Sequence, residues 1–402
     1  MQKRRSLRPT WGILGTVIVV AAAVFAVYRM GPWAPATGPE TGTPRPLGSP
    51  VAVAGRSVSV IGAGDILLHP DLWSQAKQDG GGQMEYTPML AGVKASIEAS
   101  DLALCHMETP VAPPGGPYTG FPRFSVPQEV VRAIKTVGYE GCSTGSNHSI
   151  DQGFDGVKRT LDAFDQAQLG HAGTYRSADE AKRPKLYTVK GVNIAHLSYA
   201  KYFNGLTRPA GQEWIANLIE PKKIEADAAA ARTAGAEIVV VSLHWGTEYV
   251  YEPDVDQQTW ARAVAALRNV DVVFGHHAHV VQPVERISGK WIVYGMGNQI
   301  ARHEEPINDN REGVMIRVTF TPSSEAKRWT VAAVEAVPTF VDLNPDIRVV
   351  DLERALADPG LPAARRRIYE AAVERIQGHL LTRGADEAGL IVRGTAPAPR
   401  TS

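Results

Sequence analysis

The chain has 402 residues, 44% of them hydrophobic and 21% charged, so it can bury the core of one large domain or two modest ones. Its 42 Lys and Arg balance its 42 Asp and Glu, which excludes a globally basic nucleic-acid binder. Two cysteines are too few for a disulfide scaffold or a Cys-rich zinc module. Any metal must therefore be held by His, Asp, Glu or Asn.

The amino-terminal segment predicts a membrane anchor. Residues 1–10 form a basic leader, and residues 11–30 (WGILGTVIVVAAAVFAVYRM) are apolar over a length that spans roughly 30 Å as a helix. Because a basic leader stays in the cytoplasm, we expect a single-pass membrane protein whose bulk is extracytoplasmic. A cleaved signal peptide is the alternative, and it also places the body outside the cytoplasm. Residues 31–55 predict a Pro/Gly-rich linker, and residues 394–402 predict a disordered tail.

Residues 56–393 predict one layered α/β domain. Short runs such as EIVVVSLH predict strands that are buried on both faces, and residues 156–169, 221–235 and 256–267 predict amphipathic helices between such strands. Later apolar runs (KWIVYGMGN, VMIRVTF and TVAAVEAV) predict a second sheet or an antiparallel extension of the first. A helix is expected over residues 363–381.

Ionisable and amide side chains follow several of these apolar runs. Ligands of such sheets bind beyond the carboxyl ends of the strands, so we expect these side chains to converge although they are far apart in the chain. In chain order they are Asp65, Glu108, Asn147, His148, His244, His277 and His279.

The histidine-rich segment GHHAHVVQ gives the sharpest signal for a metal. In an extended His-x-His, His277 and His279 can address nearby metal positions, whereas two exposed loop histidines are the alternative. His244 follows a buried strand in SLHWGTEY, with Glu248 four residues later. A lone histidine there would be structural, but next to the first cluster we interpret it as a ligand.

The segment GSNHSIDQG predicts a ligand and a proton donor side by side. Asn147 offers an amide oxygen to a metal, His148 can act as a general acid, and Asp151 can orient its imidazole. An Asn-rich turn with Gly153 in a left-handed conformation is the alternative, and both can hold together.

Two carboxylates complete the candidate site. Asp65 ends the first predicted strand in GAGDILLHP, where an isolated Asp would otherwise be read as a helix cap. Glu108 in CHMETP can bridge two metals, an arrangement that clamps a phosphoryl group. His106 either points the same way or belongs to the core.

The segment GCSTG matches the nucleophile elbow of serine hydrolases, with Ser143 as the nucleophile. An elbow needs a helix immediately after it, whereas SNHSIDQG continues as a loop, so we disfavour this alternative. Cys105 and Cys142 each precede a site motif. A disulfide is one alternative for a chain outside the cell, but we expect two buried free thiols.

Together these blocks resemble the CapA/PgsA family of poly-γ-glutamate capsule proteins, whose domain is similar to calcineurin-like metallophosphoesterases. DLALCHMETP looks like the family's D-L-x-x-x-N-x-E-x-P, and GSNHSIDQGFDG like its N-N-H-x-x-D-x-G-x-x-G. HWGTEY, GHHAHVVQPVE and YGMGNQI match its last three blocks. Asp65 falls on the family's first-strand G-D.

Some residues depart from these patterns. His106 and Ser146 replace Asn in the second and third blocks. Leu67 occupies the position of the His in the D-x-H of true phosphoesterases, and the second block lacks G-D-x-x-D. A complete two-metal centre and phosphatase activity are therefore in question.

The resemblance implies an αββα sandwich of the metallophosphoesterase type that holds one or two divalent metal ions, with Mn, Fe and Zn as candidates. It implies a role in the synthesis or export of a capsule, with the membrane, an anionic polymer such as poly-γ-glutamate and other capsule-synthesis membrane proteins as partners. The implied ligands are Asp65, Glu108, Asn147, His244, His277 and His279, with His148 as the acid. A non-catalytic assembly component is the alternative.

Overall fold

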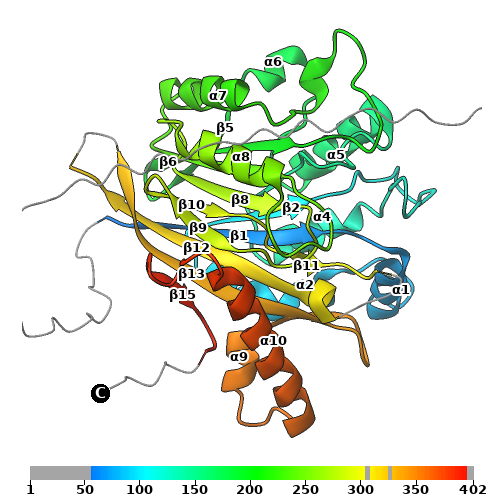
Figure 1. Cartoon of the computed structure of the whole chain (residues 1–402). Coiled ribbons are helices and arrows are strands. Elements are labelled where there is room, and N and C mark those ends of the chain that lie inside the picture. Colours follow the sequence, from blue (N-terminus) through cyan, green and yellow to red (C-terminus); the bar gives the residue numbers. More distant parts are fainter. Residues whose placement is uncertain (1–55, 304–307, 325–327, 396–402) are drawn as a thin grey trace, which may run out of the picture. The chain divides into compact units, whose positions relative to one another are not determined.

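The computed structural model describes residues 56–303, 308–324 and 328–395, and two β-sheets form their centre (Figure 1). The predicted anchor, the linker and most of the predicted tail lie outside the described residues. None of the helices in the described ranges combines the length and the apolar character that a membrane crossing requires.

The larger sheet has nine strands. They are β1 (Val58–Ile66), β2 (Leu102–Met107), β3 (Gly141–Ser143), β4 (Gly170–Ala172), β11 (Asn298–Ile300), β12 (Glu312–Pro322), β13 (Trp329–Asp342), β14 (Arg348–Asp351) and β15 (Leu390–Val392). Strands β1 to β4 are mutually parallel, whereas β12, β13 and β14 extend the sheet in antiparallel fashion from the other side of β1. Short parallel strands flank β1 (β11) and β13 (β15).

The smaller sheet has six strands in the order β5-β6-β7-β8-β10-β9. They are β5 (Lys185–Val189), β6 (Val192–Ala200), β7 (Ile238–His244), β8 (Val272–His276), β9 (Val284–Ile287) and β10 (Lys290–Val293). Strands β6, β7, β8 and β10 are parallel, and the two edge strands are antiparallel to their neighbours. The late apolar runs therefore belong to different sheets. One of them forms β10 of the smaller sheet, and the others form strands that extend the larger sheet.

The predicted helices form, with small differences at their ends. The helices are α1 (Pro70–Asp79), α2 (Thr87–Leu90), α3 (Lys94–Glu98), α4 (Glu129–Thr136), α5 (Gly153–Gln166), α6 (Ala178–Ala181), α7 (Pro221–Thr233), α8 (Val255–Ala265), α9 (Leu352–Ala357) and α10 (Ala363–Leu381), with 3₁₀ turns η1 (Ala91–Val93), η2 (Glu213–Ile215) and η3 (Asn308–Arg311). Proline starts α7, and Gly235 follows its end with φ +102°. Asp254 and Gln257 form a capping box that starts α8.

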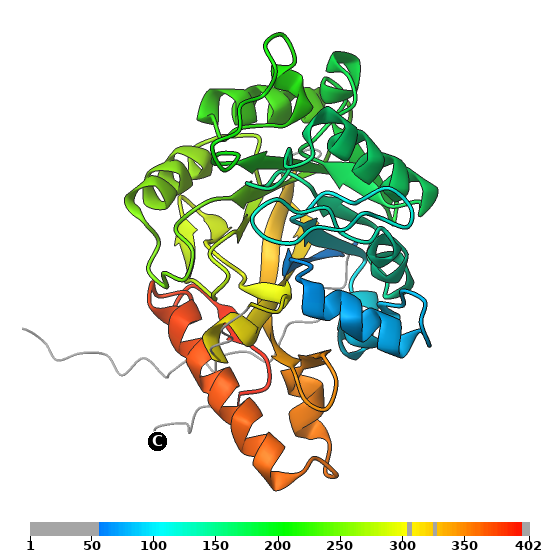
Figure 2. The same ribbon diagram turned by 90° about the vertical axis from the view of Figure 1, so that its right-hand side faces the viewer.

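Apolar cores separate four layers of helix, sheet, sheet and helix (Figures 1 and 2). The position of strand β1 between two apolar cores explains why its sequence is almost continuously apolar. Val58 and Val60 face the core between the two sheets, whereas Ile61 and Ala63 face the helices α1, α2, α4 and α5. Helices α7 and α8 cover the outer face of the smaller sheet, and α10 packs on the inter-sheet core. The four layers confirm the predicted αββα arrangement.

Cys105 and Cys142 lie opposite each other on the parallel strands β2 and β3, with their Cα atoms 4.3 Å apart. The structure joins them in a disulfide, so the expectation of two free thiols is wrong. The sequence places each cysteine before a site motif, but it does not give the register that sets the two residues opposite each other.

The two sheets approach each other closely where Gly62 of β1 meets Phe274 of β8. A Cβ atom at Gly62 would lie 2.7 Å from two ring carbons of Phe274, which is closer than carbon atoms can approach. Phe274 is fully buried, so its ring has no free space in which to move aside. The missing side chain at Gly62 therefore sets the distance between the sheets at this point.

We expect Gly62→Ala to lower the free energy of unfolding by about 1–3 kcal/mol, because overpacking a core forces side chains and backbone to shift. Combining it with Phe274→Leu should restore part of the loss. Gly378→Ala is the matched control, because a Cβ at this exposed position of α10 meets nothing within 4 Å. It should stabilise by about 0.5–1 kcal/mol. Denaturant unfolding of the three variants measures these changes, and equal effects at both glycines would contradict the packing argument.

Candidate metal centre

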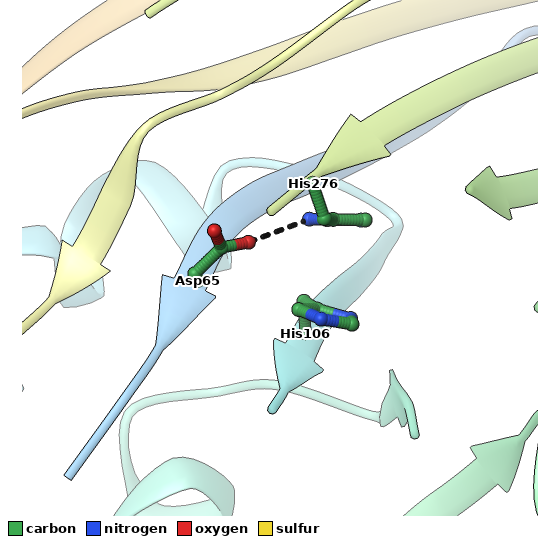
Figure 3. Close-up of side chains that lie close together, drawn as sticks. All are labelled: Asp65, His106 and His276. Carbon is green, nitrogen blue, oxygen red and sulfur yellow. Dashed lines mark hydrogen bonds and ion pairs between the residues drawn. The ribbon is translucent and has the colours of Figure 1, made fainter. Parts of the chain in front are cut away.

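The six predicted ligands come together where the parallel strands of the two sheets end. The larger sheet contributes Asp65 from β1, and Glu108 and Asn147 from the loops that follow β2 and β3. The smaller sheet contributes His244 from the end of β7, and His277 and His279 from the turn that follows β8. Figure 3 shows Asp65 of β1 close to His106 of β2 and His276 of β8, two histidines that are not among the six. The strand-end rule accounts for the position of each predicted ligand.

Two groups of ligand atoms share Glu108. The ligand atoms of Asp65, Glu108 and His279 lie within 4.8 Å of one another, and so do those of Glu108, His244 and His277. The Oε1 atom of Glu108 lies 3.6 Å from His279 Nε2 and 3.9 Å from His244 Nε2. The described residues therefore provide two adjacent positions that could hold metal ions, with the Glu108 carboxylate between them.

Asn147 joins the second position, because its Oδ1 atom lies 2.9 Å from His244 Nε2. Two further groups of possible ligands are Asp65, His106 and His276, which are all buried, and Glu248, His277 and His279, in which Glu248 is exposed. Carboxylate, imidazole and amide oxygen ligands together suit Mn, Fe or Zn.

The Glu108 carboxylate lies in an unfavourable environment for a charged group. It is 1% exposed, and neither of its oxygens receives a hydrogen bond. Burial raises the pKa of Glu108 well above its usual value. A buried carboxylate without donors is costly, and a cation bound to it removes that cost. His277 Nδ1 and His276 Nε2 are likewise buried without a hydrogen-bond partner, so the site fits a positively charged ligand.

Asp65 differs from Glu108 because histidines surround it. Its carboxylate lies 3.1 Å from His276 Nδ1 and 3.2 Å from His279 Nδ1, and it accepts the backbone N–H of His277 at 3.0 Å. Burial alone would raise the pKa of Asp65, but the hydrogen bonds from His276 and His279 hold it well below its usual value.

His279 balances the charge of the Asp65 carboxylate when no ion is bound. Burial alone would lower its pKa, but the nearby carboxylates of Glu108 and Asp65 raise it to about 10. A protonated imidazole is therefore placed where a metal ion would bind. Because a ligating histidine must be neutral, metal has to displace this proton.

The predicted proton donor lies beside this site. His148 Nδ1 lies 2.7 Å from Asp151 Oδ2, and Asp151 also accepts the backbone N–H of Phe124 at 2.9 Å. Asn204 connects the pair to the ligands, since it receives a hydrogen bond from the Asn147 amide at 3.3 Å and contacts His148 through its own amide. Asp151 thus holds the imidazole of His148 in a fixed orientation next to Asn147.

The backbone around the site adopts conformations that non-glycine residues rarely take. His277 and His279 have φ values of +94° and +54°, and Tyr249 and Asn204 have +62° and +47°. Such residues persist only where the surrounding structure holds them, and they cluster at functional sites.

The structure adds residues that the motifs did not single out. Tyr202 OH lies 2.9 Å from His277 Nε2, and Asn298 Oδ1 lies 2.9 Å from His279 Nδ1. Asn298 and His276 stand inside blocks that the sequence had marked, YGMGN and GHHAH. Tyr202 and Asn204 lie in the loop after β6, which contains no motif that would have predicted a functional residue.

The position of Ser143 does not support the serine-hydrolase alternative. Ser143 is the last residue of β3 and is fully buried, whereas the next helix, α5, begins ten residues later at Gly153. A nucleophile elbow instead exposes its serine at a sharp turn between strand and helix.

The model of the family described as bacterial capsule synthesis protein PGA_cap matches residues 59–303, and the chain belongs to this family. The chain is 33% identical over 178 residues to the PGA biosynthesis protein CapA of Bacillus subtilis. The matched region covers 42% of this chain and 45% of that protein. It is 25% identical over 217 residues to a probable polyglutamine synthesis accessory protein of Mycobacterium tuberculosis, covering 51% and 57%. The chain thus spans about half the length of these relatives.

Solved structures with a similar arrangement include a calcineurin-like phosphoesterase of Bacillus subtilis, with a TM-score of 0.44 and 10% identity over 80% of this chain and 97% of that one. A phosphatase from Mycoplasma pneumoniae also has a TM-score of 0.44, with 14% identity over 71% of this chain and 94% of that one. Likenesses of this strength do not carry an activity from one protein to another.

We expect Glu108→Gln to leave the metal-free protein at least as stable as the parent, because it replaces a buried acid with a neutral group of equal size. The same change should remove most of the stabilisation that added Mn²⁺ gives. For the parent this stabilisation is about 2.7 kcal/mol at a free metal concentration 100 times Kd. Thermal unfolding with and without Mn²⁺ measures the difference.

Glu140→Gln is the matched control for this prediction. The Glu140 carboxylate accepts the backbone N–H of Ala103 at 2.6 Å and is not among the clustered ligand atoms. Its variant should keep the full effect of metal. If Glu108→Gln also keeps that effect, Glu108 is not a ligand.

Proposed function

We propose that this chain is a membrane-anchored, extracytoplasmic protein of poly-γ-glutamate capsule synthesis or export, with a metal-dependent hydrolase-like site. Its family membership and the printed roles of its relatives support the capsule role. The observation that carries the metal site is the buried carboxylate of Glu108, which has no hydrogen-bond donor and lies among histidines of the other sheet.

Each group of the site has a distinct task in this proposal. Asp65, Glu108, Asn147, His244, His277 and His279 hold one or two divalent cations, with Glu108 between the two positions. A bound cation polarises a substrate oxygen and lowers the pKa of a water toward neutrality. His148 donates a proton to the leaving group, and Asp151 keeps the Nδ1 side of its ring occupied so that Nε2 faces the substrate.

Two observations support a position outside the cytoplasm. The basic leader followed by an apolar segment is typical of a protein whose amino end stays inside. The disulfide between Cys105 and Cys142 is of a kind that persists in oxidising compartments. The anionic polymer, the membrane and other capsule-synthesis membrane proteins are the proposed partners.

A reporter fused after Ser402 tests this topology. Alkaline phosphatase in that position should be active, and a fluorescent protein that folds only in the cytoplasm should stay dark, because the basic leader retains the amino end inside. The converse pattern would refute the anchored orientation.

We expect His148→Ala to lower turnover by about 10²–10⁴-fold with metal still bound, the usual contribution of a positioned acid. Asp151→Asn should cause a smaller loss, because it alters only the partner that orients the ring. The purified chain is assayed on phosphoesters and γ-glutamyl peptides, and its metal content is measured by elemental analysis.

Asn147→Ala is the contrasting variant, because it should lower metal affinity as well as rate. Capsule formation in cells provides a second readout of the same variants. A His148→Ala strain with normal turnover and normal capsule would show that this imidazole is not the proton donor.

A non-catalytic role in assembly is the second candidate, and one observation favours it. Leu67, which is buried, stands two residues after Asp65 where the D-x-H pattern places a histidine ligand. Metal-loaded protein that turns over neither substrate class but restores capsule in a deletion strain would support this role.

A further inference from the structure

A short hairpin between β2 and α4 ends beside the proposed proton donor. Thr119 and Ser125 exchange two backbone hydrogen bonds of 2.9 Å. The Thr119 hydroxyl also donates to the carbonyl of Arg123 at 2.6 Å, so the residues between the two strands of this hairpin form a tight tip. Next to the tip, the Phe124 ring meets the His148 ring edge-on, with centroids 4.7 Å apart. These contacts hold the tip at one place relative to His148.

Arg123 lies on this tip and reaches the carboxylate that orients the proton donor. Its Nη1 atom lies 3.5 Å from Asp151 Oδ1, and the other oxygen of Asp151 lies 2.7 Å from His148 Nδ1. One carboxylate therefore separates Arg123 from the imidazole. The Asp151 side chain is completely buried and that of His148 is 6% exposed, whereas the Arg123 side chain is 42% exposed. Arg123 is thus the member of this group that faces solvent.

Most of the Arg123 guanidinium has no protein partner. The group has five N–H donors, and among the described residues its contact with Asp151 is its only hydrogen bond or ion pair. At 3.5 Å this contact is longer than a usual N–H···O hydrogen bond. Lys201, in the loop after β6, is by contrast held by two carboxylates, at 3.4 Å from Asp254 and 2.8 Å from Asp256. Arg123 therefore has donors that it can offer to a ligand.

These donors lie on the leaving-group side of the site, because His148 is the proposed donor of a proton to the leaving group. Hydrolysis of a γ-linked glutamate amide adds one water across the C–N bond. The hydroxyl joins the γ-carbonyl carbon, the leaving nitrogen takes a proton from His148, and the remaining proton of the water returns to His148. The carbon that carries this nitrogen also carries the α-carboxylate of the next residue. Such a substrate thus places a carboxylate one carbon atom away from the nitrogen that His148 protonates.

We propose that Arg123 is a substrate-binding residue that holds the α-carboxylate on the leaving-group side of the scissile amide. A guanidinium suits this task, because its planar fork matches the two oxygens of a carboxylate. The proposal rests on the proposed function and deepens it, because it names the part of an anionic polymer that the site recognises. A phosphoester whose leaving alcohol carries no acid gains nothing from Arg123, so the residue separates the two substrate classes.

Arg123→Gln tests the proposal in the purified full chain. The probes are a γ-linked pentamer of glutamate and the same pentamer with its α-carboxylates converted to carboxamides. Isothermal titration calorimetry measures both affinities, and chromatography checks that the pentamers stay intact; where they are cleaved, kcat/KM values replace the affinities. The parent should prefer the acidic pentamer, and Arg123→Gln should lower this preference about 10-fold, a usual contribution of charge-assisted hydrogen bonds.

Two further variants separate recognition of the carboxylate from support of the site. Arg132→Gln is the matched control, because Arg132 of α4 is also an exposed arginine with one carboxylate partner, Glu85 at 3.3 Å, and it contacts no candidate ligand. It should keep the preference of the parent. Arg123→Lys retains the charge without the fork and should recover only part of the preference. If Arg123 only supported Asp151, Arg123→Gln would weaken binding of both pentamers equally, which would overturn the proposal.

The results also separate this proposal from the proposed function. A parent chain that neither binds nor cleaves either pentamer would refute the polymer as a partner, and the proposal with it. A parent that binds both pentamers equally well, or an Arg123→Gln chain with the full preference of the parent, would refute only the role of Arg123.

Discussion

The Glu108 carboxylate is the constraint on which the rest of the site depends. It is buried, it accepts no hydrogen bond, and Asp65 adds a second buried carboxylate nearby. Burial favours the uncharged form of Glu108, but the Asp65 carboxylate keeps its charge and needs positive charge beside it, which the described histidines within reach can supply. His279 supplies it as an imidazolium, with a pKa raised to about 10. The same imidazole, once neutral, becomes a ligand, so one arrangement serves the protein with and without an ion.

This constraint explains why the site needs both sheets. The carboxylates of Asp65 and Glu108 come from the larger sheet, whereas His244, His277 and His279 come from the smaller one. The hydrogen bonds between Asp65 and the turn that carries His277 and His279 connect the two layers at the point where their strands end. Charge compensation and sheet packing are therefore parts of the same arrangement.

The sequence predicts the layers and most of the site because both follow from local patterns. Apolar runs mark the strands, and polar residues at strand ends mark the site, so Asp65, Glu108 and His244 could be named before the fold was known. Contacts that depend on which strands are neighbours could not be named. The Cys105–Cys142 disulfide requires the register of β2 and β3, and Tyr202 reaches His277 from a loop without any motif.

Gly62 has a consequence for the choice of ion. The glycine lets β1 and β8 approach until the Phe274 ring touches the backbone, and Asp65 lies three residues further along β1 while the His277 turn follows β8. The absence of one methyl group thus fixes how far apart the two halves of the ligand set stand. If the site holds an ion as proposed, that separation would restrict the ionic radius in addition to the chemistry of the ligands. A residue that never touches the ion can therefore decide which ion fits.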